Sequence, residues 1–129
     1  MATNGRNKGA AFERDIAKML DDELGISFKR DLEQYREGGH GDLIPSDPAF
    51  PFTLELKRYA DGPIGGQKAW WSQTCVAARR EGKYPALIYR YDRNPIRCVV
   101  PMDPNHWQDD GHVIEMNFEA FCYLVREAM

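Results

Sequence analysis

The stretch FTLELKRY, residues 52–59, alternates apolar and polar side chains and predicts a β-strand. Successive side chains on a strand point to opposite faces, so Glu55 and Lys57 share one face with Thr53. The side chains on the other face, which point into a core, are Phe52, Leu54 and Leu56. A carboxylate can ligate a hard divalent cation, and a neighbouring ammonium can orient water and stabilise a charged phosphate. Alone, an exposed Glu/Lys pair is commonplace, so its interpretation depends on the neighbouring elements.

Asp42 begins the strand that precedes this stretch, residues 42–44. We expect the two strands to form an antiparallel hairpin, which would bring Asp42 next to Glu55. Two carboxylates this close repel each other unless a cation lies between them. The sequence GGHG at 38–41 leaves little bulk beside Asp42, which would let a phosphate backbone approach. The alternative is a turn aspartate that caps the local backbone.

A helix is predicted from about residue 8 to residue 24, because apolar side chains recur at helical spacing and Gly25 can end it. Glu13 borders the apolar stripe of this helix, so its side chain could reach over the sheet toward the same site. The alternative is a first-turn glutamate that complements the helix dipole. A flexible, polar arm that includes residues 1–7 precedes the helix and carries Arg6 and Lys8.

The rest of the chain reads as alternating strands and helices. Predicted strands cover 26–30, 85–91 and 96–100, and predicted helices cover 67–81 and 118–127, the first ended by Gly82 and the second begun by Asn117. The order is αβββαββα without an internal repeat, which indicates an α/β sandwich of helices around a mixed sheet. With 129 residues, 43% of them hydrophobic, the chain can bury one core. We therefore expect one domain, residues 1–129.

These residues, in this order, resemble the PD-(D/E)xK nucleases, and among them the small archaeal-type (Hjc-like) Holliday junction resolvases and their phage relatives. The resemblance covers roughly residues 6–91 and rests on KGAAFERDIAKML, GHGDLI, LELKR and QKAWWSQTCVAARREGKYPALIYR. It implies a restriction-endonuclease-like αβββαβ core. The family's proline before the first aspartate is Gly41 here, which does not touch the chemistry.

The resemblance also implies the roles of the site residues. Asp42, Glu55 and Glu13 would bind magnesium, for which manganese could substitute, and the Leu56 carbonyl is a further possible ligand. Lys57 would act on the attacking water. The substrate would be DNA, above all a four-way junction cut by a homodimer during recombination or repair. The candidate nucleic-acid-binding residues are Arg6, Lys8, Lys68, Gln73, Arg79 and Arg80.

Two alternatives remain open from the sequence. One is another DNA nuclease of the same fold, acting on a flap, an end or a specific site. The other is a catalytically inactive nucleic-acid-binding module, against which the intact Asp42, Glu55 and Lys57 argue.

The formal net charge of −3 hides a division along the chain. Residues 53–97 carry nine Lys or Arg against four Asp or Glu, whereas residues 101–129 carry one against six. Because local potential governs phosphate contact, a basic face can bind nucleic acid despite a modest pI. The alternative is an ordinary solvated surface.

The remaining features bear on packing and location. Trp70 and Trp71 point to different sides of their helix and favour core or dimer packing over base contacts. The three cysteines are 23 and 24 residues apart, which predicts reduced, buried thiols. His40 either tunes the Asp42 site or is a turn residue. No stretch approaches the ~20 apolar residues of a membrane span, and the start lacks the apolar core of a signal peptide. We therefore expect a cytoplasmic protein, in the host cytoplasm if a phage encodes it, with no membrane partner.

Overall fold

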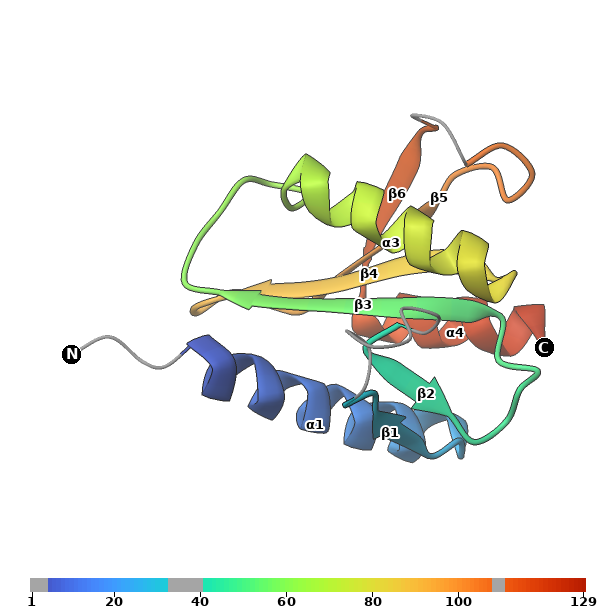
Figure 1. Ribbon diagram of the computed structural model, residues 1–129, viewed down its shortest axis with the longest axis horizontal. Helices are drawn as coiled ribbons and strands as arrows, with labels where there is room; N and C mark the ends of the chain where they lie inside the picture. Colours follow the sequence, from blue (N-terminus) through green and yellow to red (C-terminus); the bar gives the residue numbers. More distant parts are fainter. Residues whose placement is uncertain (1–4, 33–40, 108–110) are drawn as a thin grey trace.

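The computed structural model describes residues 5–32, 41–107 and 111–129, and side chains from Lys8 onward. Within these ranges a four-stranded mixed sheet lies between two layers of helices (Figure 1). Helices α1 (Gly5–Leu24) and α4 (Phe118–Ala128) cover one face, and α3 (Lys68–Glu81) covers the other. This arrangement confirms the predicted mixed sheet flanked by helices. No helix in the described ranges is long and apolar enough to cross a membrane.

The sheet consists of β3 (Phe52–Tyr59), β4 (Tyr84–Tyr91), β5 (Arg97–Pro101) and β6 (Val113–Asn117), in that spatial order. β3 and β4 run parallel, and α3 makes the crossover between them. β4, β5 and β6 pair antiparallel. The C-terminal ends of β3 and β4 therefore meet at one end of the sheet.

The predicted hairpin between residues 42–44 and 52–59 is wrong. β2 (Leu43–Pro45) pairs antiparallel with β1 (Phe28–Arg30), in a separate two-stranded sheet. The loop between β2 and β3 contains Phe50, which is fully buried and packs edge-on against Phe28 with ring centroids 5.0 Å apart. The loop follows this buried ring and does not form a tight hairpin turn between β2 and β3. β3 pairs with β4 instead.

The first helix begins earlier than predicted. α1 starts at Gly5, so residues 5–7 are helical and do not belong to the expected arm; residues 1–4 lie outside the described residues. The apolar stripe used for the prediction begins only at Phe12. Its periodicity could not show where the helix starts, because residues 5–9 include no apolar side chain to mark the preceding turn.

One strand was missed. β6 is a sheet edge, and none of its residues is fully buried. Its five residues alternate too weakly to stand out from the loop before them. The other predicted elements differ from the observed ones by two residues or fewer at each end. Gly82 ends α3 in the left-handed conformation, with φ 70°, and the Asn117 side chain accepts a hydrogen bond from Ala120 N at the start of α4.

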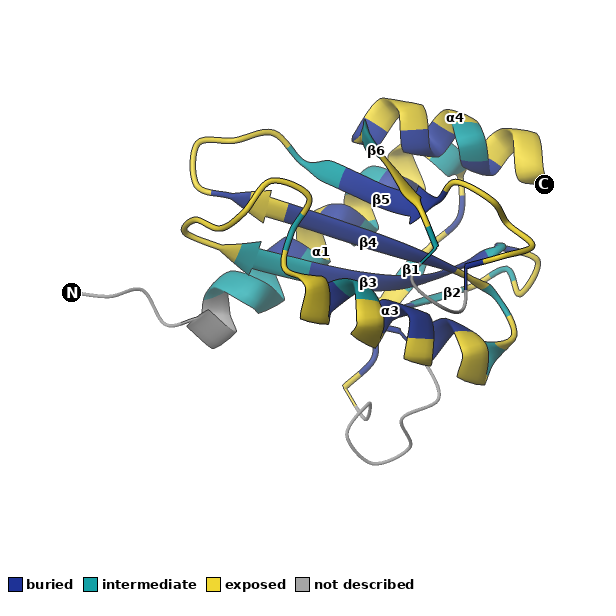
Figure 2. Ribbon diagram, turned by 90° about the horizontal axis from the view of Figure 1, so that it is seen from above, coloured by how far each residue is buried: buried dark blue, intermediate teal, exposed yellow. Residues whose placement is uncertain are grey.

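The core lies mainly between the sheet and the α1/α4 layer. Figure 2 shows β3, β4 and β5 mostly buried and the outer turns of the helices exposed. Phe52, Leu54 and Leu56 point into it, as predicted. The opposite face of β3 is also covered, because α3 packs over it and buries Thr53 and Glu55. Trp70 lies in this second core against Tyr89 and Tyr91, which confirms its packing role. The three cysteines are free and buried, as expected.

Candidate active site

Asp42 is fixed to β3 by its backbone and by its side chain. Its N–H donates to the Leu54 carbonyl at 2.7 Å, and its Oδ2 accepts from Leu56 N–H at 2.7 Å. Its own carbonyl accepts from Asp31 N–H at 3.0 Å, which ties this point to the end of β1. Asp42 therefore lies beside Glu55, although the two strands do not form the predicted hairpin.

Gly41 is the reason that the two backbones can approach this closely. A Cβ at residue 41 would lie 2.3 Å from the carbonyl oxygen of Leu54 and 2.9 Å from its nitrogen. Both neighbours are backbone atoms, so neither could turn away as a flexible side chain would. Gly41 therefore makes room for β3 itself, and the expected approach of a phosphate to the glycine-rich stretch stays a prediction. The rest of the GGHG stretch, including His40, lies outside the described residues.

The carboxyl groups of Asp42 and Glu55 are both almost fully buried, with 6% and 5% of their residue surfaces exposed. Burial, followed by the nearby charge of Asp42 and the hydrogen bond between the two carboxyl groups, raises the pKa of Glu55 to about 9. Burial also raises the pKa of Asp42, although the hydrogen bond from Leu56 N–H opposes the rise. The pair therefore favours holding a proton when no cation is present.

Glu13 and Lys57 complete the group of four residues proposed from the sequence. All four line one pocket of about 460 Å³, beside the edge strand β3. Lys57 lowers the pKa of both buried carboxyl groups, and Glu13 raises it, so each lies within electrostatic reach of the pair. Glu13 Oε1 also accepts a 2.8 Å hydrogen bond from Arg30 Nε of β1, a partner that the sequence gave no reason to expect.

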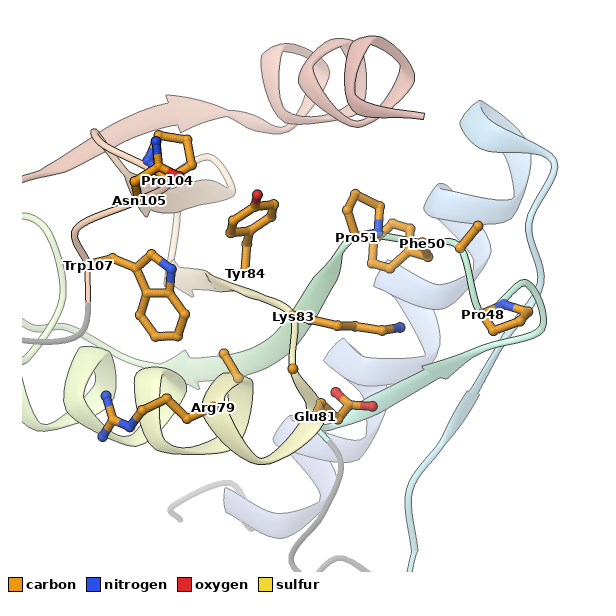
Figure 3. A pocket seen from close by; sticks show the side chains of 13 residues that line it. Pro48, Phe50, Pro51, Arg79, Glu81, Lys83, Tyr84, Pro104, Asn105 and Trp107 are labelled. Atoms are coloured by element: carbon orange, nitrogen blue, oxygen red, sulfur yellow. The ribbon is translucent and has the colours of Figure 1, made fainter.

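The candidate nucleic-acid-binding residues divide between two places. Lys8 and Gln73 line the same pocket as the acids, and Lys68 is exposed at the start of α3. Arg79 and Arg80 lie at the opposite end of α3, where Arg79 lines a larger pocket of about 810 Å³ with Lys83, Tyr84 and Trp107 (Figure 3). The side chain of Arg6 is not among the described side chains.

Arg58 and Tyr59, which were not predicted as site residues, also line this pocket, called the acidic pocket below. Arg58 directly follows the Glu-x-Lys motif, and that adjacency was the available signal. Tyr59 stacks on Trp70 with ring centroids 5.1 Å apart, so it closes the pocket against the second core. Its role depends on a contact between β3 and α3 that no local pattern reveals.

The donor atoms of this pocket suit a hard divalent cation in kind. Carboxylate and carbonyl oxygens are the ligands such ions prefer, and the pocket is lined by the carboxylic acids Asp42 and Glu55 and by Leu56 between Glu55 and Lys57. Among the described residues, no three Asp, Glu, His or Cys side chains already lie close enough to hold an ion together. Once both are ionised, however, two neighbouring buried carboxylates repel each other, and a cation between them relieves this repulsion.

A mixed sheet between helices, with an aspartate, a Glu-x-Lys motif and a helix glutamate around one pocket at its edge, defines a nuclease of the PD-(D/E)xK class. The chain belongs to the family described as "Phage putative PDDEXK endonuclease", whose model matches residues 4–126.

The structure is also similar to that of a Holliday junction resolvase, Hjc from the archaeal hyperthermophile Archaeoglobus fulgidus. The TM-score is 0.58 at 14% sequence identity, and the similarity covers 92% of this chain and 99% of that chain. At this identity the similarity shows a shared fold, which confirms the restriction-endonuclease-like core. No curated protein matches the chain.

Proposed function

We propose that this protein is a divalent-cation-dependent endonuclease that hydrolyses DNA, and that its substrate is branched DNA such as a four-way junction. The observation that carries the proposal is the burial of Asp42 and Glu55 side by side, in one pocket with Lys57 and Glu13. Burying two like charges is costly. A cation bound between the two carboxylates, as in a nuclease site, would offset this cost.

Each side chain has a task in the proposed reaction. Asp42, Glu55 and the Leu56 carbonyl would hold magnesium, or manganese in its place, which when bound polarises the scissile phosphate and activates water. Because the two carboxyl groups favour holding a proton, binding the ion requires them to release it. Lys57 would position the attacking water and offset negative charge in the transition state. Glu13 would join the ligands if Arg30 gave up its ion pair.

The choice of DNA and of a junction is supported by three observations. Lys8, Arg58 and Gln73 surround the acids and offer donors to phosphate oxygens. The segment from 53 to 97 has a strong excess of basic residues. A protein of the same fold is described as a Holliday junction resolvase. We further propose a homodimer, because a two-fold enzyme can make the paired incisions that resolve a junction.

The main rivals are a nuclease of this fold that cuts flaps, ends or specific sites, and an inactive binding module. A binding module has no need of two buried acids facing a polyanion. The intact pocket therefore favours catalysis over binding alone. The rival nucleases differ in the DNA that they cut, so a comparison of substrates distinguishes them.

The decisive experiment compares labelled four-way junction, flap and linear duplex, each with and without magnesium. We expect magnesium-dependent cleavage of the junction, and at least about a hundred-fold loss in Asp42→Asn and Glu55→Gln, because each removes a carboxylate that holds the ion. Asp22→Asn is the matched control, since Asp22 is exposed on α1 and forms an ion pair with Lys18 one turn earlier in the same helix. Parental cleavage rates in the two site variants would show that the active site is misassigned. Faster cleavage of flap or duplex would replace the junction as substrate.

A further inference from the structure

Three charged side chains from three elements meet at the border of the acidic pocket, which Asp42, Glu55 and Lys57 line. Lys8 comes from α1, Arg58 from β3, and Asp92 from the turn that follows β4. Asp92 Oδ1 lies 3.1 Å from Lys8 Nζ and 2.7 Å from Arg58 Nη1. Both cations thus converge on a single carboxylate oxygen. Sequence separation hides this arrangement, since Lys8 and Asp92 are 84 residues apart.

The turn that carries Asp92 is built to present its carboxylate here. β3 and β4 are parallel neighbours with Tyr59 opposite Tyr91, so the residue after β4 lies beside the end of β3. Asp92 N–H donates to the Ala60 carbonyl at 3.1 Å, and the Asn94 side chain donates to the Asp92 carbonyl at 2.8 Å. Arg93 takes a positive φ of 63°, which is uncommon for a residue other than glycine. The backbone of Asp92 is therefore held in place by contacts other than the two ion pairs.

The cations belong to the pocket, whereas the carboxylate lies outside it. Lys8 and Arg58 both line the pocket that contains Asp42, Glu55 and Lys57, and Asp92 is not among its lining residues. The side chains of Lys8 and Arg58 are 24% and 18% exposed, against 45% for Asp92. An anion that enters from the pocket would meet two partly desolvated cations and one well-solvated competitor.

We propose that Lys8 and Arg58 form a phosphate-binding subsite next to the catalytic acids, which the Asp92 carboxylate occupies until a backbone phosphate of the substrate displaces it. The proposal rests on the proposed function, since it takes the phosphate to come from DNA. A carboxylate and a phosphodiester each carry one negative charge and accept the same ammonium and guanidinium hydrogen bonds. Asp92 is thus an internal competitor that lowers the affinity of the free protein for any polyanion without the correct fit.

The first test measures DNA affinity without chemistry. Fluorescence anisotropy with labelled junction and duplex, in EDTA, compares the parent with Asp92→Asn and the matched control Asp22→Asn. Both variants lose one negative charge, but only the first frees the two pocket cations. We expect Asp92→Asn to tighten binding about three- to ten-fold and Asp22→Asn less than about two-fold, because phosphate contacts respond to local charge. Arg58→Gln should remove most of the gain when combined with Asp92→Asn.

An equal gain in both variants would overturn the subsite, because it would reflect net charge alone. No gain in Asp92→Asn, with a lowered melting temperature, would also overturn it, because the three residues would then be only a structural clamp between α1 and the sheet.

The second test uses inorganic phosphate, so that it does not depend on DNA as the substrate. The side-chain Nε–Hε signal of Arg58 is followed by NMR during a phosphate titration. We expect it to shift at lower phosphate concentration in Asp92→Asn than in the parent or in Asp22→Asn. If this holds while no DNA is bound or cut, the subsite stands and the proposed function fails. If the parent cleaves DNA but phosphate leaves this signal unmoved in all three proteins, the function stands and the subsite fails.

Discussion

The carboxyl group of Glu55 is buried beside that of Asp42. Burial that suits the proposed cation site lowers the stability of the ionised, metal-free protein. The metal-free folded protein holds a proton on Glu55 up to a pKa of about 9, whereas an unperturbed glutamate loses it near 4.5. Between these values the folded state binds one more proton than the unfolded chain. The contribution of Glu55 to the free energy of unfolding therefore falls as the pH rises through this window.

Replacing Glu55 with Gln should remove this pH dependence. The slope contributed by one such group is at most about 1.4 kcal/mol per pH unit. In urea unfolding with EDTA, we expect Glu55→Gln to match the parent near pH 5 and to exceed its free energy of unfolding at pH 8. Glu127→Gln, in the exposed last turn of α4, controls for the loss of a carboxylate. A stability difference that stays constant between pH 5 and pH 8 would contradict the proposed burial cost.

Gly41→Ala tests whether the close approach of two backbones positions Asp42. The new Cβ would meet the Leu54 carbonyl oxygen at 2.3 Å, so one backbone must move. We expect a loss of about 1–3 kcal/mol in urea unfolding, typical of overpacking, and a strong loss of metal-dependent cleavage. Gly9→Ala is the matched control for stability, because its Cβ would meet nothing within 4 Å in a helix that alanine favours. Unchanged cleavage by Gly41→Ala would show that Asp42 does not need this contact.

The site residues differ in how far the sequence could reveal them. Glu55 and Lys57 follow from the alternation within one strand, and Asp42 stands out through its glycine-rich approach. Arg30, by contrast, is defined by a hydrogen bond to Glu13 across 17 residues, and Asp92 by contacts with two distant elements. Contacts of this kind arise only when the sheet is assembled. A single sequence carries no local signal for them.

At the scale of the elements, β3 is an edge strand of its sheet, yet helices cover both of its faces. One face packs on α1 and the other on α3, so its polar side chains are covered as well. The buried hydroxyl of Thr53 donates a 2.6 Å hydrogen bond to Glu81 of α3, so it is not left without a partner. The alternation gave the facing of each side chain correctly. It could not tell that α3 would lie over the polar face, or that β4, and not β2, would be the partner.

The start of α4 offers a clean test of a locally encoded element. Asn117 Oδ1 accepts a 2.7 Å hydrogen bond from Ala120 N, at the junction between β6 and the helix. Asn117→Ala should cost about 1 kcal/mol in urea unfolding, the usual effect of losing an N-cap. Asn117→Asp keeps the acceptor and should remain within a few tenths of a kcal/mol of the parent. Equal losses in the two variants would indicate that the side chain contributes by packing and not by capping.

At the scale of the whole molecule, basic and acidic residues are divided along the chain. Basic residues gather between 53 and 97, the segment that supplies β3, α3 and β4, and acidic residues gather in the last 29 positions. The acidic pocket lies at β3, the edge strand of the four-stranded sheet. A net charge of −3 therefore does not argue against the proposed DNA substrate, because phosphate contact depends on local charge.

The size of the protein leads to the last prediction. The described residues of one 14.8 kDa chain gather Asp42, Glu55 and Lys57 around a single pocket. Resolving a four-way junction requires two incisions on opposed strands, so a junction resolvase of this kind should act as a two-fold dimer with apolar or aromatic contacts at its interface. Sedimentation at micromolar concentration should give twice the mass of one chain, at least with junction DNA bound.

A supercoiled plasmid with an extruded cruciform makes the two incisions visible. Paired cuts within one encounter give linear product, whereas separate cuts give a nicked circle first. We expect linear product from the parent, and nicked product when the parent is mixed with excess Glu55→Gln chain, because most active sites then lie in mixed dimers with one competent subunit. A monomer even on junction DNA, with nicked circles as the first product of the parent, would reject paired incision. The site would then belong to a nuclease that makes single cuts.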